Sequence, residues 1–174
     1  MPQNLELKAA VSSVTQTERI AERLRARHRG TFLQKDTYFN LLGGRLKLRE
    51  TPGMLSELIW YVRPERLPGR YSDYQITKVR KSGEIRRALN AILGTKTVVK
   101  KRRAVYLYKN ARIHIDRVSG LGGFVEFEVI VRKGKSQAGR LMTFLIRTFG
   151  VRKSDRIRWS YSDLLLRTRK RSRR

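Results

Sequence analysis

The chain has 174 residues, with 41 Lys and Arg against 14 Asp and Glu, so its formal charge is +27. Hydrophobic residues make up 40% and charged residues 32%, which favours a globular protein over a disordered one. The absence of cysteine excludes disulfides and thiolate metal sites, and no apolar run approaches the roughly 20 residues that span a bilayer. The excess positive charge predicts a polyanionic partner, such as nucleic acid, anionic lipid or a phosphorylated small molecule.

The ends of the chain carry two further expectations. The first residues, "MPQNLELKAAV", lack the basic and apolar regions of a signal peptide, so a cytoplasmic location is expected. The last eight residues, "RTRKRSRR", include six Lys and Arg, and such runs are usually solvated and disordered. We therefore expect one domain over residues 1–166 and a disordered basic tail over residues 167–174.

The first half of the chain predicts one helix and several strands. Residues 4–9 alternate and read as a strand. Residues 15–30 read as a helix that begins at a capping box of Thr15 and Glu18 and ends at Gly30. Residues 34–40 and 44–50 flank the turn "LLGG" and predict a hairpin. Residues 56–63, ended by Pro64, and residues 72–79 predict two more strands.

The second half predicts three helices and three strands. Residues 82–94 read as a helix with Ser82 as its cap and Gly94 at its end. Residues 97–108, 111–118 and 124–132 read as strands, the last two separated by the turn "SGLGG". Residues 136–150 and 160–167 predict two further helices.

The predicted strands share a pattern in which one face is apolar and the other ionic. Side chains alternate along a strand, so Arg45, Lys47 and Arg49 lie opposite Leu46 and Leu48. One interpretation is an open antiparallel sheet with its charges in water. The other is a closed barrel whose ionic face points inward, which is tolerable where it binds something of opposite charge. Many cations with a few carboxylates would suit a polyphosphate carried with Mg2+ or Mn2+.

The segment "LGGFVEFEVIV" places Glu126 and Glu128 on the same face of one strand, although the chain has few carboxylates. Like charges on one face repel each other. Two explanations remain open from the residues alone. A divalent cation could lie between the pair and phosphate oxygens, or the pair could form ion pairs with Lys or Arg on a neighbouring strand.

Six segments in order resemble the CYTH family, the triphosphate tunnel metalloenzymes. They are "NLELK", "QKDTYF", "GRLKLRE", "VVKKRRAVY", "IHIDRVSGLGGFVEFEV" and "SYSDLLL". The resemblance runs from about Asn4 to Leu166 and is greatest to the branch called class IV adenylyl cyclase. It implies an α+β fold with a closed eight-stranded antiparallel barrel, the triphosphate tunnel, and helices packed outside.

The resemblance also implies site residues. Those expected to bind triphosphate are Lys8, Lys47, Arg49, Arg63, Lys101 and Arg103. Those expected to hold Mg2+ or Mn2+ are Glu6, Asp116, Glu126 and Glu128, together with Asn4, which replaces the first glutamate of the family's opening motif. A neutral amide there puts the affinity for metal in question. His114 is expected to be structural or to contact phosphate, and Asp36 and Tyr38 to serve in packing or turns.

The reaction stays open at this stage, and no catalytic residue is assigned. The expected activity is adenylyl cyclase-like, converting ATP to cyclic AMP and pyrophosphate. The alternative is an inorganic or organic (thiamine or nucleoside) triphosphatase. An alternative of another class is a non-enzymatic module that binds polyphosphate or RNA. Expected partners are ATP or another triphosphate, nucleic acid bound non-specifically by the basic surface and tail, and a second copy in a homodimer.

Overall fold

The computed structural model describes residues 4–62, 70–131 and 134–171. Its strands are β1 (Asn4–Val11), β2 (Arg27–Phe39), β3 (Arg45–Glu50), β4 (Ser56–Val62), β5 (Arg70–Val79), β6 (Thr95–Tyr108), β7 (Ala111–Val118) and β8 (Gly122–Ile130). Its helices are α1 (Val14–Arg23), α2 (Ser82–Leu93), α3 (Lys135–Thr148) and α4 (Tyr161–Arg171), with a 3-10 turn, η1, at Lys153–Asp155. None of the helices in these ranges has the length and apolar character of a membrane span.

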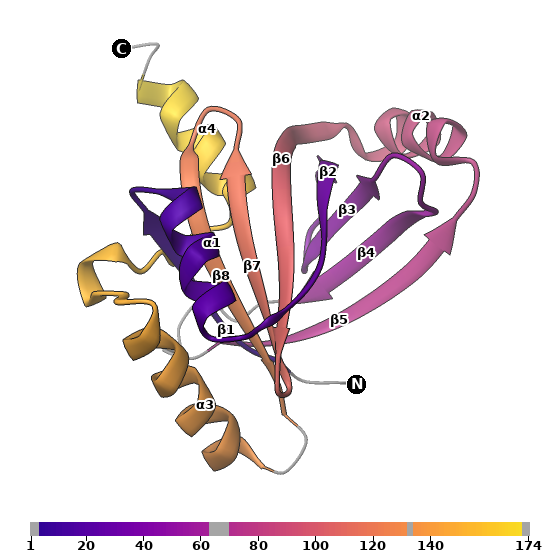
Figure 1. Ribbon diagram of the computed structural model, residues 1–174. Coiled ribbons are helices and arrows are strands. Elements are labelled where there is room, and N and C mark those ends of the chain that lie inside the picture. The colour runs from indigo at the N-terminus through magenta and orange to yellow at the C-terminus, as the bar shows by residue number, and fades with distance from the viewer. Residues whose placement is uncertain (1–3, 63–69, 132–133, 172–174) are drawn as a thin grey trace.

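All eight strands belong to one antiparallel sheet, which confirms the predicted α+β class (Figure 1). The strand order is β1-β5-β4-β3-β2-β6-β7-β8, and β1 also pairs with β8, as in a barrel. The two seams of β1 differ in extent. Eight residue pairs join β1 to β8, whereas three pairs, at Arg70–Ser72, join it to β5 within the described residues. Complete closure of the barrel therefore stays a prediction.

The first helix is shorter than the sequence predicted. Ser13, rather than Thr15, caps α1 by accepting a hydrogen bond from the amide of Gln16, and the helix ends at Arg23. Residues 27–30, expected in the helix, belong to β2 and pair with β6. Gly30 lies at an irregularity in that pairing with a φ of 132°, so its conformational freedom serves a bulge and not a helix end. Long-range strand pairing here overrides local helix propensity.

The other helices follow the predictions more closely. Helix α2 begins at Ser82, although Lys81 occupies the cap position, and Gly94 ends it with a φ of 70°. Helix α4 extends to Arg171, so residues 167–171 of the expected disordered tail are helical, which corrects that part of the prediction. The last three residues, 172–174, lie outside the described residues. The domain boundary at residue 166 stays a prediction.

The main hydrophobic core lies between the apolar outer face of the sheet and two helices. Ile113, Val125 and Phe127 are fully buried under α1 and α3. Phe127 meets Phe149, just beyond α3, with ring centroids 5.1 Å apart. Each side chain of this size contributes about 1.5–3 kcal/mol on burial. The strand alternation therefore leaves the ionic face pointing to the other side of the sheet.

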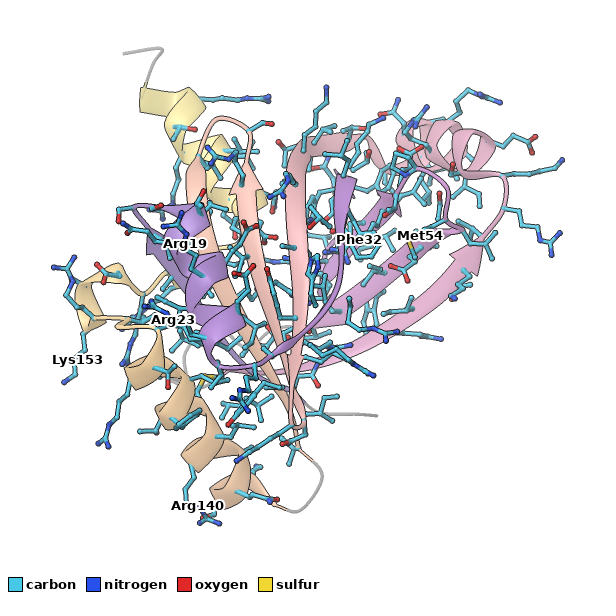
Figure 2. All side chains as sticks on the ribbon, in the orientation of Figure 1. Arg19, Arg23, Phe32, Met54, Arg140 and Lys153 are labelled. Atoms are coloured by element: carbon cyan, nitrogen blue, oxygen red, sulfur yellow. The ribbon has the colours of Figure 1, made fainter. Side chains whose placement is uncertain are left out.

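A second core cluster covers one end of the space that the inner face of the sheet encloses. Tyr161, in the first turn of α4, packs against Phe124 and Val118, which lie on the same strand faces as the ionic residues. Further cations lie outside: Figure 2 shows Arg140 and Lys153 pointing away from the body of the molecule, and Arg19 and Arg23 on α1 are exposed. The sheet thus separates an inner set of charges from an outer one.

Candidate functional site

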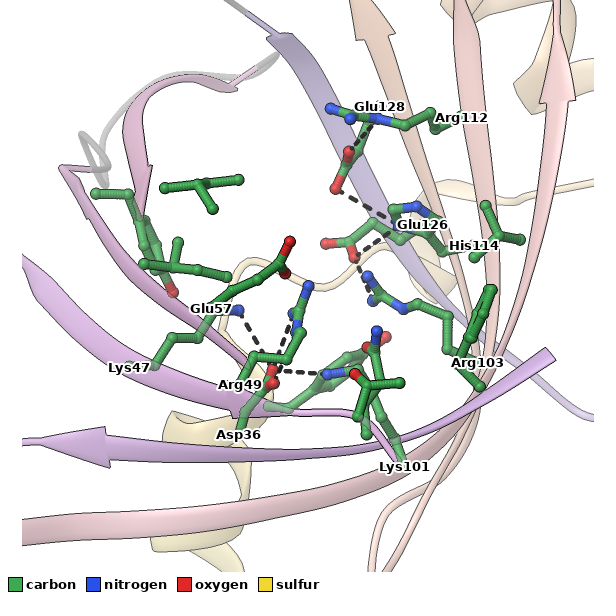
Figure 3. Close-up of a pocket in the computed structure, with 18 of the residues that line it drawn as sticks. Asp36, Lys47, Arg49, Glu57, Lys101, Arg103, Arg112, His114, Glu126 and Glu128 are labelled. Atoms are coloured by element: carbon green, nitrogen blue, oxygen red, sulfur yellow. Dashed lines mark hydrogen bonds and ion pairs between the residues drawn. The ribbon is translucent and has the colours of Figure 1, made fainter. Parts of the chain in front are cut away.

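The inner face of the sheet lines a cavity of about 500 Å3, to which all eight strands contribute side chains (Figure 3). Nine of the predicted site residues line it, namely Asn4, Glu6, Lys8, Lys47, Arg49, Lys101, Arg103, Glu126 and Glu128. Asp116 is fully buried directly behind Arg103. Arg63 lies outside the described residues. The structure therefore brings nearly all the described candidates to one cavity, while their roles stay proposals.

One side of the cavity is rich in cations that converge on a single carboxylate. Asp36, on β2, accepts hydrogen bonds from Arg49 Nε at 2.8 Å and from Lys101 Nζ at 2.7 Å. Lys47 Nζ lies 3.3 Å from the same carboxylate. Strand register explains the convergence. Asp36 is the direct cross-strand partner of Arg49 on β3, and β2 also pairs on its other side with β6, which carries Lys101. Three cations around one carboxylate leave a local excess of positive charge.

Burial shifts the protonation of these groups. It lowers the pKa of Lys101 to about 7 and that of Lys47 to about 8, and neighbouring arginines reinforce the shift against the opposing effect of Asp36. Burial would raise the pKa of Asp36, but the nearby Arg49 and Lys101 outweigh it and hold that pKa well below its usual range. Near neutral pH a large fraction of Lys101 is therefore neutral and can gain a proton when an anion approaches, whereas Lys47 is mostly protonated already.

The other side of the cavity is rich in carboxylates. Arg103 donates to both oxygens of Asp116, at 2.7 and 2.6 Å, and to Glu126 at 2.9 Å. Tyr161 donates its hydroxyl to Asp116 at 2.8 Å, so α4 supports the same network. Lys8 lies 3.3 Å from Glu126. Although burial opposes it, Lys8 and Arg103 hold the pKa of Glu126 well below its usual range.

The predicted pair of like charges is compensated by neighbouring strands. Lys8 and Arg103 are the ionic partners of Glu126, and Arg112 lies 2.9 Å from Glu128. The ion-pair explanation that the sequence left open is therefore observed, but inside a cavity and not on a solvated face. The two explanations are compatible, because carboxylates that hold cations can also take part in a metal site.

His114 completes a group that could hold a metal ion. Its Nδ1 lies 3.8 Å from Glu126 and 3.5 Å from Glu128, and one ligand atom from each of the three residues lies within 4.8 Å of the others. These distances exceed a hydrogen bond, and the buried Nδ1 has no hydrogen-bond partner in the described part of the chain. One nitrogen and two carboxylates fit a divalent cation such as Mn2+.

Two more predicted ligands lie beside this group, and one does not. Glu6 is the direct strand partner of Glu128, and the buried amide oxygen of Asn4 has no hydrogen-bond partner in the described structure. Asp116, by contrast, uses both its oxygens to bind Arg103 and Tyr161. It does not belong to the group around His114.

Sequence reasoning did not anticipate the contacts of three residues. Asp36 was expected in packing or a turn, but it holds three cations; Tyr38, two positions on, does pack in the second core cluster. His114 was assigned to structure or phosphate contact, although it lies beside two carboxylates. Tyr161 was not singled out. The alternation of Asp36 with Tyr38, and of His114 with Asp116, was a signal for their shared face, but their partners depend on strand order.

Comparison with known proteins now adds to this geometry. The model of the CYTH domain matches residues 2–161. The chain belongs to the CYTH family. No curated protein sequence matches it significantly.

Solved structures agree with the fold at low sequence identity. The PH1012 protein from Pyrococcus horikoshii is 22% identical with a TM-score of 0.81, over 92% of this chain and 98% of that one. A protein named as a candidate adenylate cyclase, from Vibrio parahaemolyticus, is 19% identical with a TM-score of 0.76, over 93% and 97%. HpAC1 from Hippeastrum, described as having a dominant triphosphatase activity, is 15% identical with a TM-score of 0.64, over 87% and 89%.

Replacing Asp36 by Asn tests the cation-rich side of the site. The change leaves three cations close together without their carboxylate, so we expect the free energy of unfolding to fall by about 3–5 kcal/mol. Tripolyphosphate should restore much of this loss by supplying the missing negative charge. Chemical denaturation with and without tripolyphosphate measures both effects.

The matched control is Glu50→Gln. Glu50 pairs with Arg86 and Lys35 near the surface, where removing one partner costs less than about 1 kcal/mol. Either of two results would show that Asp36 does not hold a phosphate-binding group of cations. One is that Asp36→Asn lowers the free energy of unfolding no more than the control does. The other is that tripolyphosphate does not restore it.

Proposed function

We propose that this CYTH protein is a divalent-metal-dependent enzyme that acts on a triphosphate inside the cavity. The observation that carries the proposal is the division of the cavity into two charged sides. Lys47, Arg49 and Lys101 gather on one side, and Glu126 and Glu128 lie with His114 on the other. A triphosphate with a bound divalent cation also has two charged parts. Its anionic phosphates match the cation-rich side, and its divalent cation matches the carboxylate-rich side.

The cation-rich side would bind phosphate oxygens. Asp36 occupies the position between Lys47, Arg49 and Lys101, and it keeps these cations close together in a buried site. An entering phosphate would share or replace its contacts at little cost in rearrangement, because the cations are already oriented. Lys8 and Arg103, which contact Glu126 at the boundary of the two sides, are placed to reach the next phosphate.

The carboxylate-rich side would hold the metal. His114, Glu126 and Glu128 would supply ligands, with Glu6 and Asn4 beside them. When bound, the ion would neutralise phosphate charge and polarise a phosphorus–oxygen bond. The imidazole nitrogen favours Mn2+ over Mg2+, because Mg2+ prefers an all-oxygen shell. We assign Asp116 to positioning Arg103 instead of binding the metal, since Arg103 and Tyr161 engage both its oxygens.

The lead reaction is the cyclisation of ATP. In it the ribose 3′-hydroxyl releases its proton to solvent as its oxygen bonds to the α-phosphorus, the bond from that phosphorus to the α–β bridging oxygen breaks, and pyrophosphate leaves. An apolar group at the cavity, formed by Phe32, Met54, Leu55 and Ile76, offers a surface for a nucleobase. The second candidate is hydrolysis, in which water attacks a terminal phosphorus, and the activity described for the Hippeastrum neighbour favours it. Closure of the barrel along the β1–β5 seam is part of this proposal.

Product analysis tests the function directly. Purified protein with ATP or tripolyphosphate and Mn2+ should convert at least one of them, and chromatography separates the outcomes. Cyclic AMP with pyrophosphate identifies a cyclase, whereas ADP or inorganic phosphate identifies a triphosphatase. Absence of turnover of both substrates, with either Mn2+ or Mg2+, would contradict the proposed enzyme and favour the binding-module alternative.

The metal group predicts a specific loss of metal affinity. Glu128→Gln and His114→Gln should each weaken Mn2+ binding in the presence of a non-hydrolysable ATP analogue by at least about tenfold, or about 1.4 kcal/mol. His114→Gln should weaken Mn2+ binding more than Mg2+ binding, because it removes the nitrogen ligand. Isothermal titration calorimetry measures these affinities without turnover.

Glu57→Gln is the charge-matched control for Glu128→Gln. Glu57, on β4, lines the same cavity but is not in the metal group, so the change removes the same charge at another place. If Glu128→Gln lowers stability but leaves metal affinity at the level of the control, the carboxylate serves only its ion pair with Arg112.

Phosphate binding should change the protonation of Lys101. With a pKa of about 7, this lysine is mostly neutral at pH 8.5, and nearby phosphates should raise its pKa again. Binding of the ATP analogue should therefore take up protons, and Lys101→Gln should take up fewer than the wild-type protein. Calorimetry in buffers of different ionisation enthalpy measures the difference, with the exposed Lys96→Gln as the control. Equal uptake by all three proteins would contradict phosphate contact at Lys101.

A further inference from the structure

A second hollow lies on the outer face of β2, β6 and β7, beside the start of α2. We call it the outer groove, and it has a volume of about 980 Å3. Lys101 lines both this groove and the inner cavity. The other cations of the groove are Lys35, Arg80, Lys100, Arg102 and Arg117. None of them lines the cavity described above. The groove therefore presents a separate set of charges to the surroundings.

Its cations lie opposite one another across the strand pairs. Lys35 on β2 pairs with Lys100 on β6, and Arg102 on β6 pairs with Arg117 on β7. Like charges in directly opposed positions destabilise a sheet unless an anion compensates them. Arg102 has Glu18 at 3.1 Å. Lys100 and Arg117 are exposed and form no ion pair among the described residues. Lys35, the partner of Lys100, lies 3.3 Å from Glu50, so each opposed pair keeps one cation, Lys100 or Arg117, that an external anion can compensate.

The balance of charge differs between the two hollows. Among the described residues, the inner cavity is lined by six Lys and Arg and five Asp and Glu, namely Lys8, Lys47, Arg49, Lys101, Arg103 and Arg112 against Glu6, Asp36, Glu57, Glu126 and Glu128. The outer groove has its five cations and Lys101 against a single described carboxylate, Glu50, which already contacts Arg86 and Lys35. The uncompensated charge thus lies outside, where a polyanion too large for the cavity would meet it.

The groove also has an apolar part. Leu33 is 64%, Met54 58% and Leu55 48% exposed, although each is a large hydrophobic side chain. A ligand that fills the groove should therefore offer both anionic groups and apolar surface. A second copy of this chain is disfavoured because its formal charge is also +27. A duplex offers phosphates but stacks its bases inside, whereas a single strand exposes both phosphates and base faces.

We propose that the outer groove binds single-stranded nucleic acid. Lys100 and Arg117 contact its phosphates, and Leu33, Met54 and Leu55 pack against its bases. The proposal does not require turnover in the inner cavity, although the strand would share Met54 and Leu55 with the apolar surface described there for a nucleobase. Because Met54 and Leu55 line both hollows, the bound strand would lie beside one opening of the cavity.

The test measures binding of a fluorescein-labelled oligouridine as a function of salt. The double variant Lys100→Gln and Arg117→Gln should bind at least about tenfold more weakly. Its slope of log affinity against log salt should be shallower by about 1.4, because two phosphate contacts of a single strand are lost. The matched control is Arg140→Gln with Lys153→Gln, exposed cations on α3 and η1 (Figure 2). It removes the same charge and should change affinity less than about twofold.

A second variant separates the apolar contact from the charges. Leu33→Ser should weaken binding of the strand severalfold without changing the salt slope, since no phosphate contact is lost. An equal loss in groove and control variants would overturn the proposal in favour of general attraction to the basic surface. Tighter binding of an RNA duplex, or competition by polyglutamate as effective as that of the strand, would overturn the assignment to single-stranded nucleic acid.

Discussion

The structure depends on the pairing of each described Lys and Arg of the inner cavity with a carboxylate. Unpaired buried charges are costly, so a sheet that turns its ionic face inward needs such pairs to fold at all. Asp36 holds three of the cations, and Asp116, Glu126 and Glu128 hold the others. Because three of these cations share a single carboxylate, the pairing also creates the uneven distribution of charge on which the proposed function rests.

The strand alternation fixes where each kind of residue lies. The apolar faces of β1, β7 and β8 pack under α1 and α3, and their ionic faces then necessarily point into the cavity. Helix α4 links the two regions, because Tyr161 packs in the second core cluster and donates to Asp116. Burial of apolar surface outside thus supports the geometry of the charges inside.

Much of the fold and of the site could be predicted from the sequence. The alternating strands and the turn glycines located nearly every strand. In "VVKKRRAVY", however, the pattern alone did not show which pair faces inward, and the family resemblance chose Lys101 and Arg103, which do line the cavity. Lys100 and Arg102 accordingly lie outside.

The remaining features depend on which strands become neighbours. No local pattern indicates that Asp36 on β2 meets cations from both β3 and β6, because the chain separates it from Lys101 by 65 positions. The end of α1 was missed for a related reason: residues 27–30 have neighbours in β6 that compete with helix formation. Strand order, and with it the pairing of charges, emerges only in the folded sheet.

The central claim is that the cation-rich side of the cavity binds the phosphates of a metal–triphosphate complex and the carboxylate-rich side binds its metal. A crystal structure of the protein with Mn2+ and a non-hydrolysable ATP analogue tests it most directly. We predict phosphate oxygens against Lys47, Arg49 and Lys101, and Mn2+ against His114, Glu126 and Glu128. An analogue bound outside the cavity, or Mn2+ bound away from those three residues, would contradict the account.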